Sequence, residues 1–224
     1  MSDIAPPPAA VTARRLARAA RTAALSSHMA EGGWPYGSLV LMACDLDATP
    51  ILLISRLAEH TRNIAADPRV ALLIDGTVGL ASPLTGPRLT LMGRAVASTE
   101  SRHRARFLAR HEDAHTYADF GDFSFYRVEV ERAHLVAGFG RIHWLTAEDV
   151  RFGGGAAELA AAEAEVIARV NAVLSGSGDS RRVIGADAEG CDFMRDGRLA
   201  RLDFDNPVAE AEGLEREILE ALRT

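Results

Sequence analysis

The sequence contains no lysine and no glutamine, so all 25 of its basic residues are arginine. Without a lysine the chain cannot form a Schiff base, which excludes covalent catalysis of the pyridoxal-phosphate type. It has two cysteines, Cys44 and Cys191, which lie far apart in sequence within apolar stretches. Isolated cysteines in such stretches are more often buried apolar residues than a disulfide or a metal site.

Long apolar segments are also absent, and no run approaches the length of a membrane-spanning helix. The N-terminus starts acidic and proline-rich, without the apolar segment typical of a signal peptide. We therefore expect a cytoplasmic protein that does not bind membranes. The formal net charge of −6 favours neither nucleic acid nor an anionic surface. The 224 residues, 48% of them hydrophobic, can build the core of one or two small domains.

Short apolar strands alternate with short helices over the first 150 residues, after an expected disordered arm at residues 1–11. The pattern predicts a helix from Thr12 to about Ala30, strands at Ser38–Cys44 and Ile51–Ile54, a helix at Leu57–Ala66, strands at Val70–Asp75 and Arg88–Ser98, a helix from about Thr99 to Ala118, and strands at Phe123–Ala137 and Ile142–Leu145. One face of the first helix carries arginines typical of a solvated surface, namely Arg14, Arg15, Arg18 and Arg21. Six or so strands with short interposed helices indicate a β-barrel rather than a parallel sheet.

A glycine-rich segment at residues 153–155 predicts a linker to a second, smaller unit at residues 156–224. Here the pattern predicts a helix at Ala156–Leu174, strands at Arg182–Ala186, Cys191–Arg195 and Leu199–Phe204, and a helix at Val208–Leu222. The dipeptide Asp196–Gly197 is typical of a tight hairpin turn. This unit is therefore a small α+β domain.

The most informative stretch runs from Ile51 to Asp75, where two apolar strands flank a polar segment that begins a helix. Strand ends and helix N-termini present free backbone N–H groups, which suits them to phosphate and other anions. Candidate contacts in this segment are Ser55, Arg56, His60, Thr61, Arg62 and Asn63. Helix capping alone also explains serine and threonine here, so both interpretations stay open.

The order strand, Ser-Arg-Leu-Ala-Glu-His-Thr-Arg-Asn, helix, Asp-Pro-Arg-Val, strand resembles the FMN-binding split-barrel family related to pyridoxamine 5′-phosphate oxidase. It is most similar to the haem-utilisation (HugZ-type) branch, which carries a small C-terminal domain. Three further segments agree in order, at residues 35–40, 87–95 and 138–144. The resemblance implies an α+β fold with a split β-barrel at residues 12–151 and the C-terminal α+β domain at residues 156–224. It also implies a homodimer that binds a small-molecule ligand in its interface.

The resemblance also implies roles for particular residues around an FMN. The cofactor would be held by Ser38, Ser55, Arg56, His60, Thr61, Arg62, Asn63, Arg88 and Arg141, with His143 and Arg94 on the substrate side. The leading expectation is a flavin-dependent oxidoreductase whose substrate and catalytic residues are unknown. Because the family's oxidases use a lysine that this chain lacks, oxidation of pyridoxamine phosphate itself is not expected.

The same resemblance leaves a haem-binding or haem-degrading protein as an alternative, and a non-enzymatic module with a decayed site as another. The haem-utilisation branch carries a histidine-rich segment at the start of its C-terminal domain, and of this only Asn171 remains here. No histidine follows His143, so a haem would have to be ligated from the barrel, by His60 or His143.

The segment His111–His115 formally matches the zinc-protease pattern His-Glu-x-x-His. Arginines flank it, and no third ligand occurs at the usual downstream distance. We therefore expect the end of an amphipathic helix near the barrel rim and no metal site.

Overall fold

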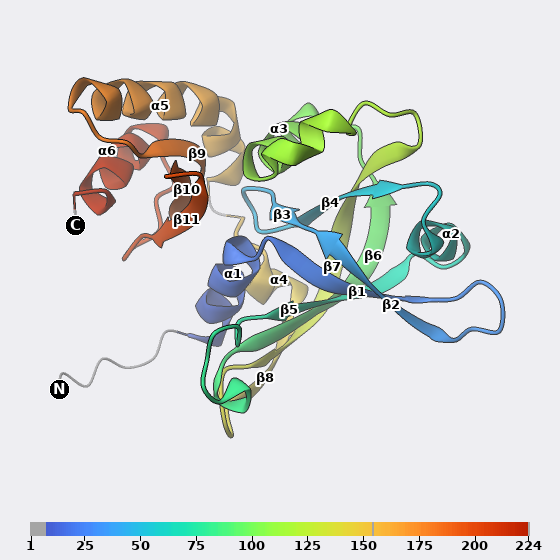
Figure 1. The fold of residues 1–224 in the computed structure, drawn as a ribbon. Helices are drawn as coiled ribbons and strands as arrows, with labels where there is room; N and C mark the ends of the chain where they lie inside the picture. The colour runs from blue at the N-terminus through green and yellow to red at the C-terminus, as the bar shows by residue number, and fades with distance from the viewer. Residues whose placement is uncertain (1–7, 154, 224) are drawn as a thin grey trace.

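The first two thirds of the chain form a curled antiparallel sheet with short helices at its ends (Figure 1). The structure is a computed structural model that describes residues 8–153 and 155–223, so most of the predicted N-terminal arm lies outside the described residues. The strands are β1 (Thr22–His28), β2 (Pro35–Leu41), β3 (Ala43–Cys44), β4 (Pro50–Ser55), β5 (Arg69–Asp75), β6 (Arg88–Ala97), β7 (Phe123–Val136) and β8 (Ile142–Thr146). Their order is β2-β1-β5-β6-β7-β4-β3, with β8 paired to the second half of β7.

Alternating apolar residues place one face of this sheet inside the barrel. Leu25, Leu72, Leu91 and Leu135 come from four neighbouring strands and are fully buried in one cluster. Helix α1 (Ala9–Ala19) closes one end of the barrel, while α2 (Glu59–Ala66) lies at the other end (Figure 1). The short helices η1 (Pro83–Thr85) and α4 (Ala147–Val150) lie in the connections before β6 and after β8.

The outer face of the sheet is covered only in part. Helix α3 (Ser101–Arg110) and the 3₁₀ helix η2 (Glu112–Thr116) pack over β3, β4 and the first half of β7. Phe107 is fully buried there and meets Phe125 edge-on, with 5.7 Å between ring centroids. The rest of the outer face, from β2 to β8, has no covering element among the described residues.

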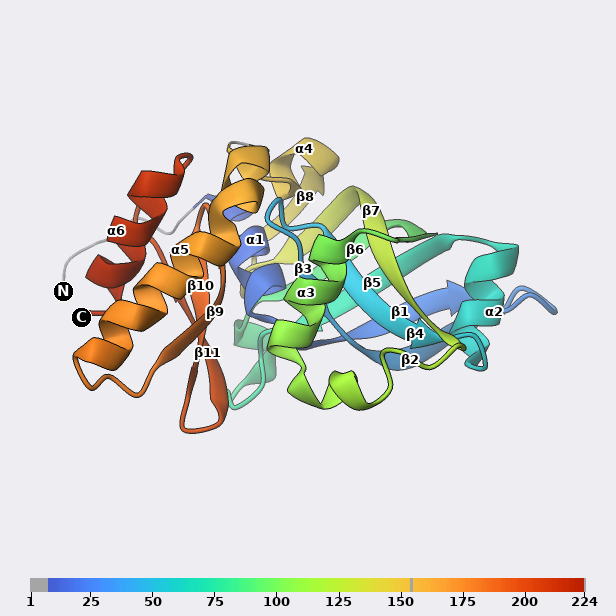
Figure 2. The ribbon, with the colours of Figure 1, turned by 90° about the horizontal axis from the view of Figure 1, so that it is seen from above.

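The C-terminal unit is a three-stranded sheet covered by two helices (Figure 2). It consists of α5 (Ala156–Gly176), β9 (Arg182–Asp187), β10 (Gly190–Arg195), β11 (Arg198–Asp203) and α6 (Ala211–Ala221). Leu159, Val166 and Val170 of α5 meet Leu214 and Ile218 of α6 in its core. The α+β class with a split barrel and a small C-terminal α+β unit is therefore confirmed.

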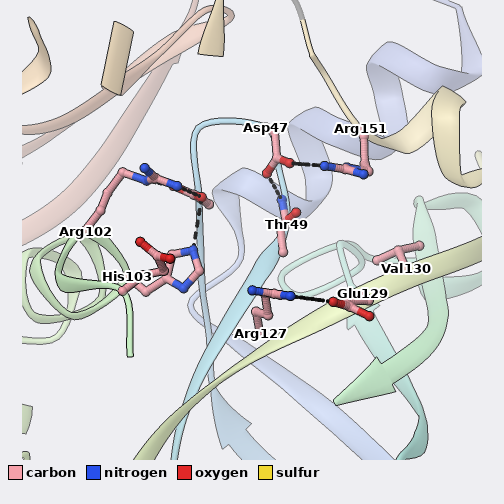
Figure 3. Close-up of a pocket in the computed structure, with 10 residues that line it drawn as sticks. Asp47, Thr49, Arg102, His103, Arg127, Glu129, Val130 and Arg151 are labelled. Carbon is pink, nitrogen blue, oxygen red and sulfur yellow. Dashed lines mark hydrogen bonds and ion pairs between the residues drawn. The ribbon is translucent and has the colours of Figure 1, made fainter. Parts of the chain in front are cut away.

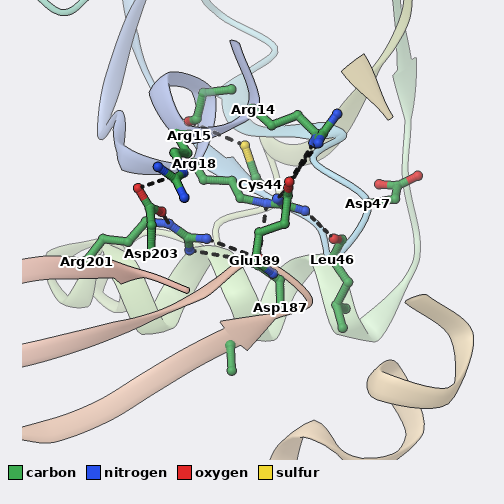
Figure 4. A network of polar contacts seen from close by, with 12 residues as sticks. Arg14, Arg15, Arg18, Cys44, Leu46, Asp47, Asp187, Glu189, Arg201 and Asp203 are labelled. Carbon is green, nitrogen blue, oxygen red and sulfur yellow. Dashed lines mark hydrogen bonds and ion pairs between the residues drawn. The ribbon is translucent and has the colours of Figure 1, made fainter. Parts of the chain in front are cut away.

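The predicted solvated arginine face of the first helix is wrong for two of its members. Arg14 and Arg18 are 8% and 2% exposed, and both donate hydrogen bonds to Glu189 in the turn between β9 and β10 (Figure 4). Arg18 also lies 3.4 Å from Asp187. These arginines join the barrel to the C-terminal sheet, so their face is an internal interface.

Two predicted helices extend too far. The helix expected from Thr12 to Ala30 begins at Ala9 and ends at Ala19, because the following residues alternate in burial and pair with β2 and β5. Pairing on both sides outweighs the helical spacing of the alanines and leucines there. The helix expected to reach Ala118 ends at Arg110. The His-Glu-x-x-His segment therefore lies in a 3₁₀ turn, where His111 Nε2 is 2.9 Å from the Met42 carbonyl.

Both cysteines are buried and unpaired, as predicted. Burial raises the pKa of the Cys44 thiol to about 11, so this thiol stays protonated at neutral pH. None of the described helices is long and apolar enough to cross a membrane.

Candidate functional site

The polar segment between β4 and α2 is held together by its own hydrogen bonds. Ser55 Oγ donates to Asp122 Oδ2 at 2.5 Å, and Thr61 Oγ1 donates to the Ser55 carbonyl at 2.7 Å. The Arg56 N–H donates to the Asp122 carbonyl at 2.7 Å. Two hydroxyls and one backbone N–H that could bind an anion are thus already used within the protein, and a carboxylate lies among them, while the Arg56 side chain is exposed.

Asn63 and Arg62 have other partners. Asn63 is fully buried; its amide donates to Ser27 Oγ at 3.1 Å and its oxygen accepts the Ala30 N–H at 3.2 Å. These bonds tie α2 to the end of β1. Arg62 is exposed and pairs with Glu59 on the same helix at 3.2 Å. Asn63 therefore has a structural role, whereas the Arg62 side chain points to the surface.

His60 is the member of this segment with unused hydrogen-bonding capacity. Its Nδ1 lies 3.1 Å from Ser38 Oγ on β2, which brings together two of the predicted residues. The other ring nitrogen, Nε2, is buried without a partner among the described residues. Burial lowers the pKa of His60, so the ring is neutral at physiological pH. A neutral imidazole with a free nitrogen can serve as a metal ligand.

Arg88 and Arg94 lie on the outer face of β6. Arg88 Nη1 donates to the carbonyls of Leu84 and Gly86 at 3.3 and 3.4 Å. Arg94 pairs with Glu131 on β7 at 3.0 Å, with both side chains exposed. The two arginines share a strand face, and neither contacts the β4–α2 segment within the described residues.

Arg141 and His143 lie beside a groove at the barrel end, which we call the β7–β8 groove. It has a volume of about 550 Å³ and is lined by Ala9, Thr12, Thr85, Pro87, Ala137, Gly140, Arg141, Ile142 and His143. Arg141 Nη2 donates to the Ala137 carbonyl at 2.5 Å, which fixes the guanidinium across the turn. Gly138 has φ +123°, a conformation that lets the chain reverse here.

The His143 imidazole is exposed and has no hydrogen-bond partner among the described residues. Its neighbours in the groove are mostly apolar, and Arg141 supplies the only charged side chain in the described lining. The structure therefore sorts the predicted residues into three separate places: the β4–α2 segment with Ser38, the outer face of β6, and the β7–β8 groove.

A second groove contains residues that the sequence did not single out (Figure 3). It has a volume of about 560 Å³ and lies between α3, the β3–β4 turn and the outer face of β7. His103 is buried, with Nδ1 2.6 Å from Ser98 Oγ and Nε2 3.1 Å from Asp45 Oδ2. Arg102 donates twice to the same carboxylate, at 2.8 and 2.9 Å.

Most charges of this second groove are paired within the protein. Arg151 binds Asp47 at 3.1 Å, and Arg127 binds Glu129 at 2.6 Å (Figure 3). Burial alone would raise the pKa of Asp45, but the hydrogen bonds from His103 and Arg102 outweigh it and hold that pKa well below its usual range. The groove is therefore a structural ion-pair network. No local motif marks it, because its residues come from four separate segments.

The comparisons with known proteins place this geometry in a family. Residues 6–150 match the family described as CREG, beta-barrel, and the chain belongs to it. Over 109 residues, or 47% of this chain, the sequence is 43% identical to the non-canonical heme oxygenase HOZ of Arabidopsis thaliana chloroplasts. The matched region spans 33% of that curated relative.

Two solved structures match almost the whole chain. A protein of unknown function from Agrobacterium tumefaciens has a TM-score of 0.78 and 28% identity, covering 98% of this chain and 99% of its own. A heme binding protein from Mycobacterium smegmatis has a TM-score of 0.62 and 28% identity, covering 98% of both chains. These matches extend through the C-terminal domain.

Proposed function

We propose that this protein binds haem in the β7–β8 groove, with His143 as the axial ligand and Arg141 as the partner of a propionate. The observation that carries the proposal is an exposed, unpartnered imidazole inside a mostly apolar groove with one guanidinium beside it. Haem needs this combination, since its ring is apolar, its iron takes an imidazole and its propionates take arginine. When bound, haem would supply iron-centred redox chemistry, while the chain supplies the ligand, the charge partner and the apolar walls.

The relatives support this choice of ligand. The Mycobacterium smegmatis structure is described as a heme binding protein, and the Arabidopsis thaliana relative as a heme oxygenase. The latter description makes haem degradation the activity to test. The matched region spans only a third of that relative, so its oxygenase activity is proposed for this protein and does not follow from family membership.

The β4–α2 segment favours haem over FMN. An FMN phosphate placed there would have to replace the bond from Ser55 to Asp122 and would meet the Asp122 carboxylate. Two like charges at that range repel each other, and the segment offers no lysine and no buried arginine in compensation. The experiment below therefore compares FMN binding with haem binding.

We further propose that the protein is a homodimer that uses the uncovered outer face of the sheet. Strand register aligns one row of outward residues across it: Leu39, Ala24, Leu73, Thr90, His134 and Trp144. Leu39 is 75% exposed, Leu73 43% and Trp144 63%. The row is apolar on four of its six strands and carries Thr90 and His134 on the other two; exposed apolar residues of this kind are typical of an interface, and a second copy offers the complementary face. Trp144 and His143 are consecutive on β8 and therefore point to opposite faces of the sheet, so this interface and the β7–β8 groove would lie on opposite sides of the same strand.

The test is a haem titration followed by absorption, with His143→Ala and His60→Ala compared against the exposed His115→Ala as the matched control. We expect His143→Ala to weaken haem binding by at least roughly tenfold and to shift the Soret band, since a ligand to iron is lost. His115→Ala should match the wild type.

A parallel titration with FMN separates the two cofactors. Retention of FMN but not haem would overturn the proposal, and loss of haem only in His60→Ala would move the ligand to α2. Haem loaded on the wild type and treated with a reductant in air should lose its Soret band faster than free haem if the protein also degrades it.

A further inference from the structure

Three arginines lie side by side at one end of the C-terminal sheet, and we call them the arginine row: Arg181, Arg195 and Arg198. Arg195 and Arg198 are cross-strand partners that close the β10–β11 hairpin. Arg181 directly precedes β9, whose Arg182 pairs with Met194, so it falls opposite Arg195. Alternation along each strand puts all three on the same face as Phe193.

The hairpin that presents this row has a defined conformation. Its turn residues, Asp196 and Gly197, have φ +51° and +73°, the geometry of a tight two-residue turn. In Figure 2 the hairpin extends beyond the end of α6, so the row lies at the edge of the domain. Arg195 and Arg198 are therefore carried by a paired β-hairpin, one on each side of its turn.

A groove of about 520 Å³ runs between this hairpin and the end of α6. The apolar part of its lining comes from Phe193, Ala200, Leu202 and Ala221. Phe193 is 8% exposed and belongs to the domain core, so this floor is continuous with the packed interior. The groove thus combines an apolar floor with a rim of three arginines and one carboxylate, Asp196.

The charges of the rim are only partly balanced by the protein. Arg181 is held by Asp179 at 2.7 Å and by the Leu222 carbonyl at 2.5 Å. Arg195 lies 3.8 Å from Asp196, and both of these side chains are exposed. Arg198 has no carboxylate partner among the described residues. Like charges directly opposite each other on a hairpin are destabilising, and a carboxylate placed between Arg195 and Arg198 would relieve this repulsion.

We propose that this groove binds an organic carboxylate with an apolar body. The carboxylate would accept hydrogen bonds from Arg195 and Arg198, because a guanidinium matches the geometry of a carboxylate and stays charged at every physiological pH. The apolar body would lie on Phe193 and Leu202. The site lies in a different domain from the β7–β8 groove, shares no residue with it, and does not depend on haem binding.

Dodecanoate is a suitable probe, with acetate and dodecyltrimethylammonium as matched controls for the apolar body and the charge. Calorimetric titration of the full-length protein should show one dodecanoate per chain and no comparable binding of either control. Arg195→Glu and Arg198→Glu should each weaken dodecanoate binding by roughly tenfold or more, which is the expected loss for a charge-assisted hydrogen bond. Arg216→Glu, on the exposed face of α6, should leave the affinity unchanged.

A further variant tests the floor without changing the charge. Ala200→Trp fills the groove and should also weaken dodecanoate binding. All four substituted side chains are exposed, so each variant should stay folded, and Arg195→Glu and Arg198→Glu should unfold no earlier than the wild type because each removes a like-charge pair. Equal dodecanoate affinity in wild type and Arg198→Glu, equal binding of the ammonium control, or no dodecanoate binding would each overturn the proposal. A parallel loss of haem affinity in the row variants would also overturn it, since the two sites would then not be separate.

Discussion

Replacing Glu189 by glutamine should strongly destabilise the protein. Glu189 accepts hydrogen bonds from Arg14 at 2.7, 2.8 and 3.0 Å and from Arg18 as well (Figure 4). The side chains of all three residues are at most 10% exposed. The carboxylate therefore compensates two buried guanidinium groups at the junction of the barrel and the C-terminal domain.

The size of the effect depends on the hydrogen-bond and ion-pair partners that each arginine retains in the variant. Breaking a buried ion pair typically costs about 3–5 kcal/mol, because a charge is left uncompensated. Arg18 keeps Asp187 at 3.4 Å and the Leu46 carbonyl at 2.7 Å, and Arg14 keeps the Asp149 carbonyl at 2.7 Å. Because these partners remain, we expect Glu189→Gln to lower the free energy of unfolding by about 3 kcal/mol, the lower end of that range. For a chain of this size that corresponds to a Tm lower by roughly 6–12 °C.

The assay is urea and thermal unfolding followed by circular dichroism at pH 7. Glu215→Gln is the matched control, since Glu215 pairs with Arg169 at 2.6 Å between two partly exposed side chains. Exposed pairs contribute at most about 1 kcal/mol, so the control should lose far less stability. A loss below 1 kcal/mol in Glu189→Gln would refute the reasoning, because the junction would then tolerate two unpaired arginines.

Three further outcomes are expected. Gly93→Ala should lower the free energy of unfolding by about 3 kcal/mol, since the added Cβ would lie 2.0 Å from a backbone oxygen of β7. Gly37→Ala is the control: its Cβ would meet open space, so the free energy of unfolding in the same urea titration should not change. Asp45→Asn should lower the free energy of unfolding at pH 7 and make that free energy depend less on pH in acid. The reason is that the depressed pKa of Asp45 contributes stability that is complete above about pH 4 and is lost as pH falls towards the folded-state pKa. Leu73→Asp should shift the protein from dimer to monomer in sedimentation velocity, and Val173→Asp on α5 should not.

The sequence predicted the elements whose partners are close in the chain. Strands such as Arg69–Asp75 and Arg88–Ala97 show the period-two burial that alternating residues indicate, and the Asp196–Gly197 turn follows from local chemistry. The burial of Arg14 and Arg18 could not be predicted in this way. Their carboxylate partners lie more than 160 residues away, and an arginine that pairs over such a distance looks identical in sequence to one in water.

In the candidate site, too, contacts between residues close in the chain could be predicted and contacts between distant segments could not. Arg141 and His143 were expected on the cofactor and the substrate side of a ligand, and the turn before β8 places both at one groove. The spacing around Ser55 gave no sign of Asp122, which comes from the loop before β7 and takes the hydrogen bond of the serine hydroxyl. The second groove, with Asp45 and His103, depends on contacts between segments 58 residues apart and left no local signal.

Residues that bind an anion and residues that cap a helix are the same types, so the pattern around the β4–α2 segment can only suggest the first role. What separates the two is whether the donors are free. Ser55, Thr61 and Asn63 all donate hydrogen bonds within the protein, whereas His60 Nε2 and the His143 imidazole have no partner in the part of the chain that the structure describes. Unused nitrogen lone pairs suit a metal centre, and used hydroxyl donors do not suit a phosphate. The balance of satisfied and unsatisfied groups therefore favours an iron-containing ligand over a flavin phosphate.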